Sequence, residues 1–184
     1  MIHNFVITGI AAINQQNILG IDGHMPWGRI KSDLAFYKSE TIGKTLICGG
    51  NTYRSLPPQA MKNRKIVVLT RQQPPKDLSD NIMFLNEYLC PGFVMEDIKN
   101  FVNSEEIMIV GGGLIYKFFE FQYDKFYLTT IKGQDFDTTS RNVVYFDVDL
   151  KSRGSEKNWS KRTIEWTTEE NEIGKFDVKI QELS

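Results

Sequence analysis

The sequence predicts a single α/β domain spanning residues 1–184, with a mixed but mainly parallel central sheet, flanking helices and a C-terminal antiparallel hairpin. Short runs that are apolar on both faces alternate with short helical patterns, which is typical of a sheet covered by helices on both sides. The final segment instead alternates apolar and polar residues, as a half-solvated hairpin does. A chain of 184 residues also has enough material to bury one sizeable core.

Six apolar runs predict the strands of the main sheet. In chain order they cover residues 5–13, 44–48, 65–70, 82–85, 107–110 and 126–131. Residues 163–167 and 175–180 alternate between apolar and polar side chains. This pattern predicts the hairpin, with its turn at residues 169–174. The polar segment 132–160 has little pattern and is expected to form loops.

Composition excludes several classes of protein. Hydrophobic residues make up 41% and charged residues 24% of the chain, as in soluble globular proteins. A net charge of -1 gives no reason to expect nucleic-acid binding, and no apolar stretch is long enough to span a bilayer. Cys48 and Cys90 cannot form a disulfide framework, and the N-terminus has no signal-peptide pattern, so a reducing, cytoplasmic location is expected. His3 and His24 lack metal-ligand spacing, so no metal site is expected.

The most informative stretch is residues 25–33, Met-Pro-Trp-Gly-Arg-Ile-Lys-Ser-Asp, whose last residue, Asp33, stands near the start of a short amphipathic helix. At ~100° per residue, Asp33, Leu34, Tyr37 and Lys38 span about 140° of the helix and share one face. A carboxylate, two apolar groups and a cation on one face can line a pocket for a flat ligand with polar edges. Alternatively, Asp33 only stabilises the helix N-terminus, where an acid is favoured.

Two glycine turns carry the signal for ligand binding. Gly49-Gly50 and Gly111-Gly112-Gly113 each follow a predicted strand and precede a helix, where main-chain N–H groups can approach phosphate. Either turn alone is better explained by tight packing of helix on strand. Together they lie at the carboxyl ends of parallel strands, where open α/β sheets bind ligands. No serine or cysteine sits in a nucleophile motif, so a single acid beside these turns indicates cofactor chemistry with one proton transfer.

The combination of segments resembles the dihydrofolate reductase family over most of the chain. The matching segments, in family order, are Ile10-Ala11-Ala12, Ile18-Leu19-Gly20, Met25-Pro26-Trp27, residues 33–38, residues 52–57, residues 64–71, residues 110–116 and Tyr127-Leu128-Thr129. The resemblance implies NADPH-dependent reduction of 7,8-dihydrofolate to tetrahydrofolate. It also implies sensitivity to antifolate inhibitors, a monomer, and a mobile lid near residues 14–29.

The resemblance also implies a role for individual positions. Asp33 would be the catalytic acid, Thr129 would hold it, and Arg64 would bind the α-carboxylate of the substrate. The substrate-binding residues would be Ile10, Ala11, Asp33, Leu34, Tyr37, Lys38, Arg64, Val110 and Thr129. The cofactor-binding residues would be Ala12, Ile18, Gly20, His24, Met25, Asn51, Thr52, Thr70, Arg71, Val110, Gly111, Gly112, Gly113, Leu114, Ile115 and Tyr116. A cis peptide would join Gly111 to Gly112.

The chain departs from the family pattern in three places. Gly50 stands where many relatives carry a cation that contacts the 2′-phosphate of NADPH. In this chain we expect Arg71 to make that contact instead. Residues 135–146 form a longer segment than usual, and residues 86–93 resemble an insertion with an exposed turn at Cys90-Pro91-Gly92.

Two other functions remain open on the residues alone. One is a related reductase acting on another pterin or on a riboflavin precursor, which Arg64 and Lys38 disfavour because they suit an anionic substrate tail. The other is a non-catalytic folate- or nucleotide-binding protein, which Asp33 disfavours.

Overall fold

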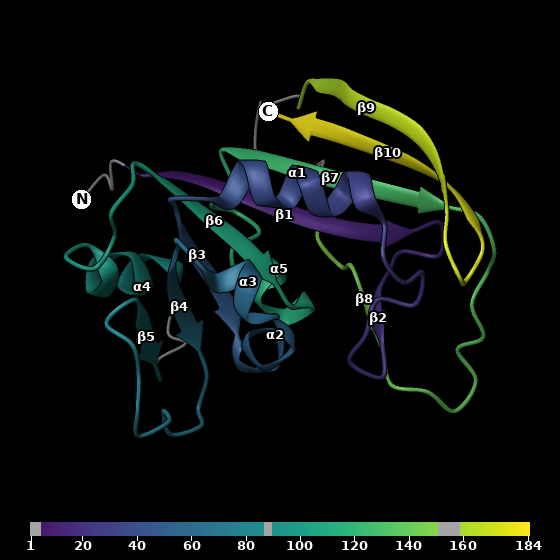
Figure 1. Cartoon of the computed structure of the whole chain (residues 1–184). Helices are drawn as coiled ribbons and strands as arrows, with labels where there is room; N and C mark the ends of the chain where they lie inside the picture. Colours follow the sequence, from purple (N-terminus) through teal and green to yellow (C-terminus); the bar gives the residue numbers. More distant parts are fainter. Residues whose placement is uncertain (1–4, 87–89, 151–158) are drawn as a thin grey trace.

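An eight-stranded sheet forms the centre of the protein in a computed structural model that describes residues 5–86, 90–150 and 159–184 (Figure 1). The order of its strands is β5-β4-β3-β6-β1-β7-β10-β9. Their bounds are β1 Val6–Asn14, β3 Thr45–Gly49, β4 Lys65–Leu69, β5 Ile82–Leu85, β6 Glu106–Gly111, β7 Lys125–Lys132, β9 Lys161–Glu170 and β10 Lys175–Leu183. The helices are α1 Lys31–Thr41, α2 Gly50–Ser55, α3 Pro58–Met61, α4 Pro91–Ile98 and α5 Gly113–Phe118.

The strand pairing confirms the predicted mixed, mainly parallel sheet. β1 pairs in parallel with β6 and β7, and β3, β4 and β5 continue the parallel part beyond β6. β10 runs antiparallel to β7 and β9, which confirms the C-terminal hairpin. Because β6 lies between β3 and β1, the carboxyl ends of these parallel strands meet at one edge of the sheet. Such an edge is where open α/β sheets bind ligands.

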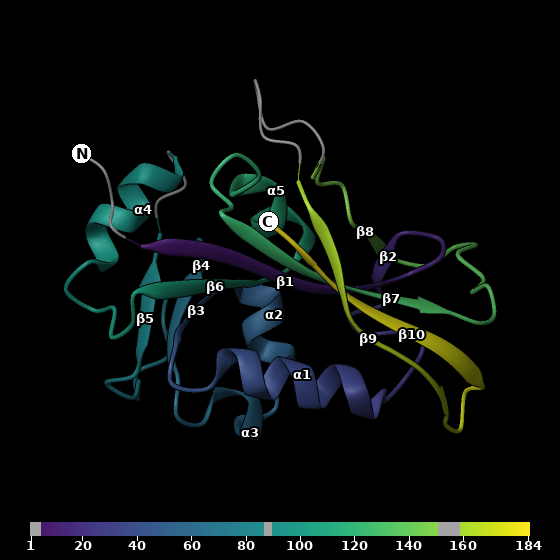
Figure 2. The same cartoon turned by 90° about the horizontal axis from the view of Figure 1, so that it is seen from above.

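Helices cover both faces of the sheet, as Figure 2 shows in a view along its plane. Ile47 belongs to the core cluster under α4 and α5, whereas its neighbours Leu46 and Cys48 belong to the cluster that packs against α1 and α2. This alternation follows from the two-residue period of a strand whose two faces are both buried. No helix in the described ranges has the length and apolar character needed to cross a membrane.

The structure corrects two local expectations. Residues 132–160 are not loop throughout, since β8 (Val143–Tyr145) pairs antiparallel with β2 (Ile18–Ile21). The expected exposed turn at Cys90-Pro91-Gly92 is wrong, because Cys90 is the N-cap residue and Pro91 the first residue of α4. Proline suits this first position since its missing N–H has no partner inside the helix.

A charged cluster joins four segments at the amino ends of the central strands. Glu106 of β6 accepts hydrogen bonds from Lys44 Nζ at 2.6 Å and from Thr8 Oγ1 of β1 at 2.5 Å. Lys125 Nζ of β7 lies 3.1 Å from the same carboxylate. Partial burial opposes its charged form, but the bonds from Lys44, Thr8 and Lys125 outweigh this and lower the pKa of Glu106 to about 2. The cluster therefore stabilises the folded state while Glu106 is ionised.

We expect Glu106→Gln to lower the free energy of unfolding at neutral pH by about 2–3 kcal/mol, from the size of the pKa depression. A depressed folded-state pKa gives stability that is present above the unfolded value of 4.5 and lost as pH falls towards about 2. The stability difference between wild type and variant should therefore shrink over that window. Urea denaturation at pH 7, 4 and 3 measures it, with Glu105→Gln as an exposed neighbouring control. A difference that stays constant with pH would contradict the assigned role.

Candidate functional site

The two glycine turns lie side by side at the carboxyl edge of the sheet. A Cβ atom on Gly49 would lie 3.9 Å from the Gly112 nitrogen, and one on Gly112 would lie 3.2 Å from Thr52 Oγ1 of α2. The peptide between Gly111 and Gly112 is cis, as the family resemblance predicts. The close approach of main chain to main chain explains why side chains are absent here, and it leaves the edge open to a ligand.

Tyr116 fixes this edge to the central strand. Its hydroxyl donates a 2.6 Å hydrogen bond to the Ile10 carbonyl of β1, and its phenol ring is buried. Gly111 has a φ of 118°, and a Cβ atom there would lie 3.2 Å from the Tyr116 hydroxyl. The position thus requires glycine both for its backbone conformation and for its contact with Tyr116.

Asp33 lies in the first turn of α1 and reaches across to Thr129 of β7. Burial raises the pKa of the Asp33 carboxyl, a hydrogen bond from Thr129 opposes this, and the nearby charge of Glu169 adds to the rise. Thr129 is itself buried and lies opposite Ala12 of β1 in the parallel ladder. A half-buried carboxyl that favours its neutral form beside the sheet edge is suited to proton chemistry.

The remaining residues of the predicted helix face differ in exposure. Tyr37 packs against the core cluster under α1, whereas Leu34 and Lys38 are exposed. The Tyr37 hydroxyl is buried, and among the described residues it has no hydrogen-bond partner. Burial raises the pKa of Tyr37 to about 12, against the opposing charge of Arg64. A buried hydroxyl without a protein partner generally needs water or a ligand.

Arg64 is a buried cation beside the C-terminal half of α1. Its Nε donates to Thr41 Oγ1 at 3.0 Å, and its Nη atoms donate to the carbonyls of Lys62 at 2.7 Å and Lys38 at 3.4 Å. Three of the five N–H groups of the guanidinium are thereby used. Desolvation lowers the pKa of Arg64, and in the described part of the chain no carboxylate forms an ion pair with it. These three neutral acceptor oxygens orient the guanidinium group of Arg64 without neutralising its charge, which remains available to an anion.

Arg54 lies beside Gly50, and sequence reasoning did not identify it. A Cβ atom on Gly50 would lie 2.8 Å from Thr70 Oγ1 and 3.5 Å from Arg54 Nη1. Arg54 donates to Gln72 Oε1 at 2.6 Å and also to Asn51 Oδ1. The available signal was its spacing, since residues four apart on a helix are neighbours.

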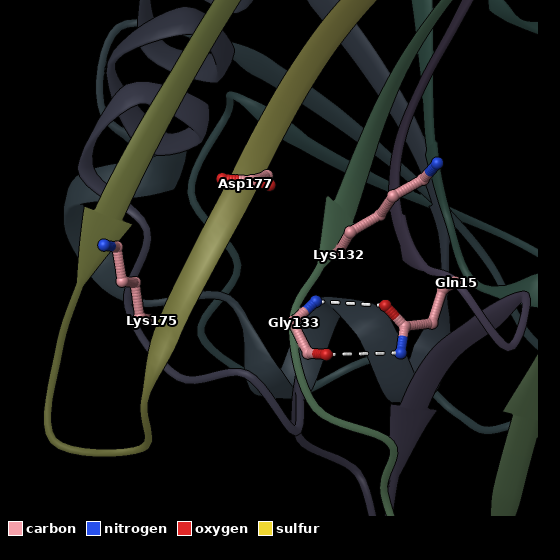
Figure 3. A pocket seen from close by; sticks show the side chains of 5 residues that line it. All are labelled: Gln15, Lys132, Gly133, Lys175 and Asp177. Atoms are coloured by element: carbon pink, nitrogen blue, oxygen red, sulfur yellow. Dashed lines mark hydrogen bonds between the residues drawn. The ribbon is translucent and has the colours of Figure 1, made fainter.

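The segment expected to form a lid is fastened to the loop that follows β7. The side-chain amide of Gln15 pairs with both main-chain groups of Gly133, at 3.0 and 3.4 Å (Figure 3). Gln16 pairs in the same way with Phe136, at 2.8 and 3.2 Å. Farther along, the Asp22 carboxylate accepts bonds from Arg141 Nε and from a main-chain N–H. The segment is therefore held through polar contacts, while Trp27 anchors its far end in the core.

The hollow in Figure 3 lies apart from the predicted site residues. It has a volume of about 420 Å³ and is lined by Gln15, Lys132, Gly133, Lys175 and Asp177, at the end of β7 and the start of β10. None of these five residues was predicted to bind substrate or cofactor. We therefore regard the hollow as part of the surface around the lid attachment.

The predicted site residues come from β1, β2, β7, α1, α2, the junction of β6 and α5, and the two ends of β4. Ile10, Ala11 and Ala12 lie on β1, Asp33, Leu34, Tyr37 and Lys38 on α1, Asn51 and Thr52 on α2, and Val110, Gly111, Gly112, Gly113, Leu114, Ile115 and Tyr116 at the junction of β6 and α5. Arg64 precedes β4, Thr70 and Arg71 follow it, Thr129 lies on β7, and Ile18, Gly20, His24 and Met25 lie on or after β2. The side chains of Ile18 and Ile115 are buried, whereas Leu114 is 87% exposed.

Comparisons with known proteins agree with this geometry. Residues 6–172 match the family model described as dihydrofolate reductase. A dihydrofolate reductase of Haemophilus influenzae is 34% identical over 70% of this chain and 74% of its own length. One from Staphylococcus haemolyticus is 31% identical over 82% of this chain and 84% of its own length. The type 8 dihydrofolate reductase of Escherichia coli is 28% identical over 81% and 88%, respectively.

We expect Gly111→Ala to be more destabilising than an ordinary substitution at a positive-φ glycine. Gly43 has a φ of 75° with nothing within 4 Å of a built Cβ, so Gly43→Ala should cost about 1–2 kcal/mol from backbone strain alone. Gly111→Ala should cost about 1–3 kcal/mol more, because its methyl group overlaps Tyr116. Parallel urea denaturation of the two variants measures the difference. Equal losses would mean that the Tyr116 contact has no steric importance.

Proposed function

Because the chain belongs to the dihydrofolate reductase family, we propose that it reduces 7,8-dihydrofolate to 5,6,7,8-tetrahydrofolate with NADPH. The cofactor, when bound, supplies a hydride from nicotinamide C4 to pterin C6, and a proton is added at N5. The observation that carries the proposal is the half-buried Asp33 carboxyl, bonded to Thr129 and placed at the same sheet edge as the two glycine turns.

Asp33 would bind the amino group and ring nitrogen of the pterin and support protonation at N5. The raised pKa of its carboxyl favours retention of a proton, and Thr129 fixes its orientation. The hydride and the proton must arrive at adjacent atoms, so orientation contributes much of the acceleration. The fastened segment at residues 14–29 would close over the nicotinamide and exclude water.

Arg64 and Lys38 would bind the glutamate tail of the substrate. Two N–H groups of the Arg64 fork remain after its bonds to Thr41, Lys62 and Lys38, which is the number that a bidentate carboxylate uses. This cationic end of the site supports a folate over a smaller pterin or a riboflavin precursor. Asp33 in turn supports a catalytic protein over a folate- or nucleotide-binding protein without activity.

The residues around the two glycine turns fit a phosphorylated dinucleotide. Arg54 and Arg71 flank Thr70, and in the described ranges neither cation forms an ion pair with a carboxylate. Two guanidinium groups near a hydroxyl in this part of the chain would suit the 2′-phosphate of NADPH. Main-chain atoms of Gly111, Gly112 and Gly113 would approach the nicotinamide and pyrophosphate, which their missing side chains permit.

Asp33→Asn tests the central assignment. The variant should fold normally but lose ~10²–10⁴-fold in turnover at neutral pH, the usual range for a positioned proton-transfer group. The measurement is the dihydrofolate-dependent loss of NADPH absorbance, with circular dichroism to verify folding. Glu40→Gln removes an acid elsewhere on α1 and should remain close to wild type. Near-normal turnover by Asp33→Asn would refute the assignment.

Arg71→Ala and Arg54→Ala test how the cofactor is selected. One charged hydrogen-bonding group contributes ~1.5–3 kcal/mol, so each variant should reduce the preference for NADPH over NADH roughly ten- to a hundred-fold. The measurement is the ratio of kcat/KM for the two cofactors. Lys132→Ala is the control, because β3, β6 and β1 separate β7 from β4. If neither arginine variant changes the ratio, the 2′-phosphate is bound elsewhere.

A further inference from the structure

The start of α1 is capped by a residue from the other end of the chain. Ile30 occupies the N-cap position and offers no side-chain hydrogen bond. Instead, the Glu169 carboxylate of β9 accepts bonds from the main-chain N–H of Lys31 at 2.7 Å and of Ser32 at 2.9 Å. Free N–H groups at a helix start need such acceptors. Glu169 therefore supplies the cap that the local sequence lacks.

The same hairpin also holds the segment that leads into the helix. Asn171 Nδ2 donates to the carbonyls of Trp27 at 2.9 Å and Arg29 at 3.0 Å. A Cβ atom on Gly28 would lie 3.1 Å from Ile173 Cγ1, so the main chain there lies directly against the hairpin. Asp33 is the third residue of the helix whose entry is fixed in this way.

We propose that Glu169 is a positioning residue for the reaction: its carboxylate holds the first turn of α1 and places a negative charge at the start of the helix that carries Asp33. The proposal rests on the catalytic role proposed for Asp33. A free helix N-terminus stabilises a nearby carboxylate and would favour ionised Asp33. The Glu169 carboxylate, bound to the free N–H groups of this helix start, offsets that attraction and adds repulsion between like charges.

The surroundings of Glu169 and Asp33 favour opposite protonation states. Burial opposes ionisation of Glu169, but hydrogen bonds from Ser32 and Lys31 outweigh it and lower the pKa of Glu169. The pKa of Asp33 moves the other way, raised first by burial and also by the Glu169 charge. The two shifts together favour a charged Glu169 beside a protonated Asp33.

The other groups around Asp33 do not replace this charge. Thr129 of β7 donates a hydrogen bond that lowers the pKa of Asp33. The Tyr116 hydroxyl of α5 donates its hydrogen bond to a β1 carbonyl. Lys31 lies in the same helical turn and attracts Glu169. The charged side chains of β10 make contacts with β9: Asp177 with Thr168, Glu182 with Arg162, and Lys179 with the Trp166 ring.

The test measures the titration of Asp33 directly and through catalysis. In Glu169→Gln, the pKa of Asp33 followed by ¹³C NMR of its carboxyl should fall by about half a unit. The rate of hydride transfer should decline with rising pH at a correspondingly lower midpoint. Glu169→Asp keeps the charge and should return both values towards wild type. Glu170→Gln removes the adjacent, exposed acid and should leave both unchanged.

Two results would overturn the proposal. One is an unchanged Asp33 pKa in Glu169→Gln, even if the variant is slower at every pH, because that pattern belongs to a structural cap alone. The other is an equal shift in Glu170→Gln, which would indicate a general surface-charge effect. Failure of the catalytic assignment is separate: it appears as normal turnover in Asp33→Asn, whereas the NMR titration depends on no turnover.

Discussion

The parallel pairing of β1 with β6 on one side and β7 on the other is the constraint on which the site depends. Ile10 and Ala12 lie on β1, the cis Gly111–Gly112 peptide ends β6, and Thr129 lies on β7. Because main-chain hydrogen bonds fix the register of all three strands, the groups that approach a ligand are set by the backbone. The Tyr116 bond to Ile10 then ties α5 to the same frame. Asp33, on α1, has to be placed by contacts outside these ladders.

Glu106 and the polar groups along α1 differ in how the protein satisfies them. At the amino ends of the central strands, Glu106 is surrounded by Lys44, Lys125 and Thr8, so its charge is paired within the protein. Asp33 and Tyr37 of α1, and Arg64 beside the end of that helix, carry buried polar groups whose partners in the described part of the protein are neutral or missing. Such groups lower stability unless something else satisfies them. Their alignment along one helix is expected of a binding site and not of a core.

The sequence predicts the main strands well because each is a continuous apolar run, and burial on both faces leaves a strong local signal. It predicts the glycine turns and Asp33 because these depend on residues within a few positions. It does not predict β2 and β8, which are short, lie in polar segments and exist only by pairing with each other. It also misses Arg54 beside Gly50 and Glu169 beside Ser32. The spacing of Arg54, one helical turn after Gly50, was a local signal for the first. The second follows from which distant segments the fold brings together, and no local pattern encodes that.

The cap on α1 links the order of synthesis to the assembly of the site. A ribosome releases α1 long before β9, so the helix that carries Asp33 emerges without the carboxylate that completes its first turn. An 11-residue helix without a cap is marginal in water. Until the β9–β10 hairpin pairs beside β7, the parallel strands can form, but Asp33 lies in the first turn of an uncapped helix whose end is frayed. Formation of these contacts between residues 137 and 138 positions apart is thus the step at which a folded sheet becomes an organised site.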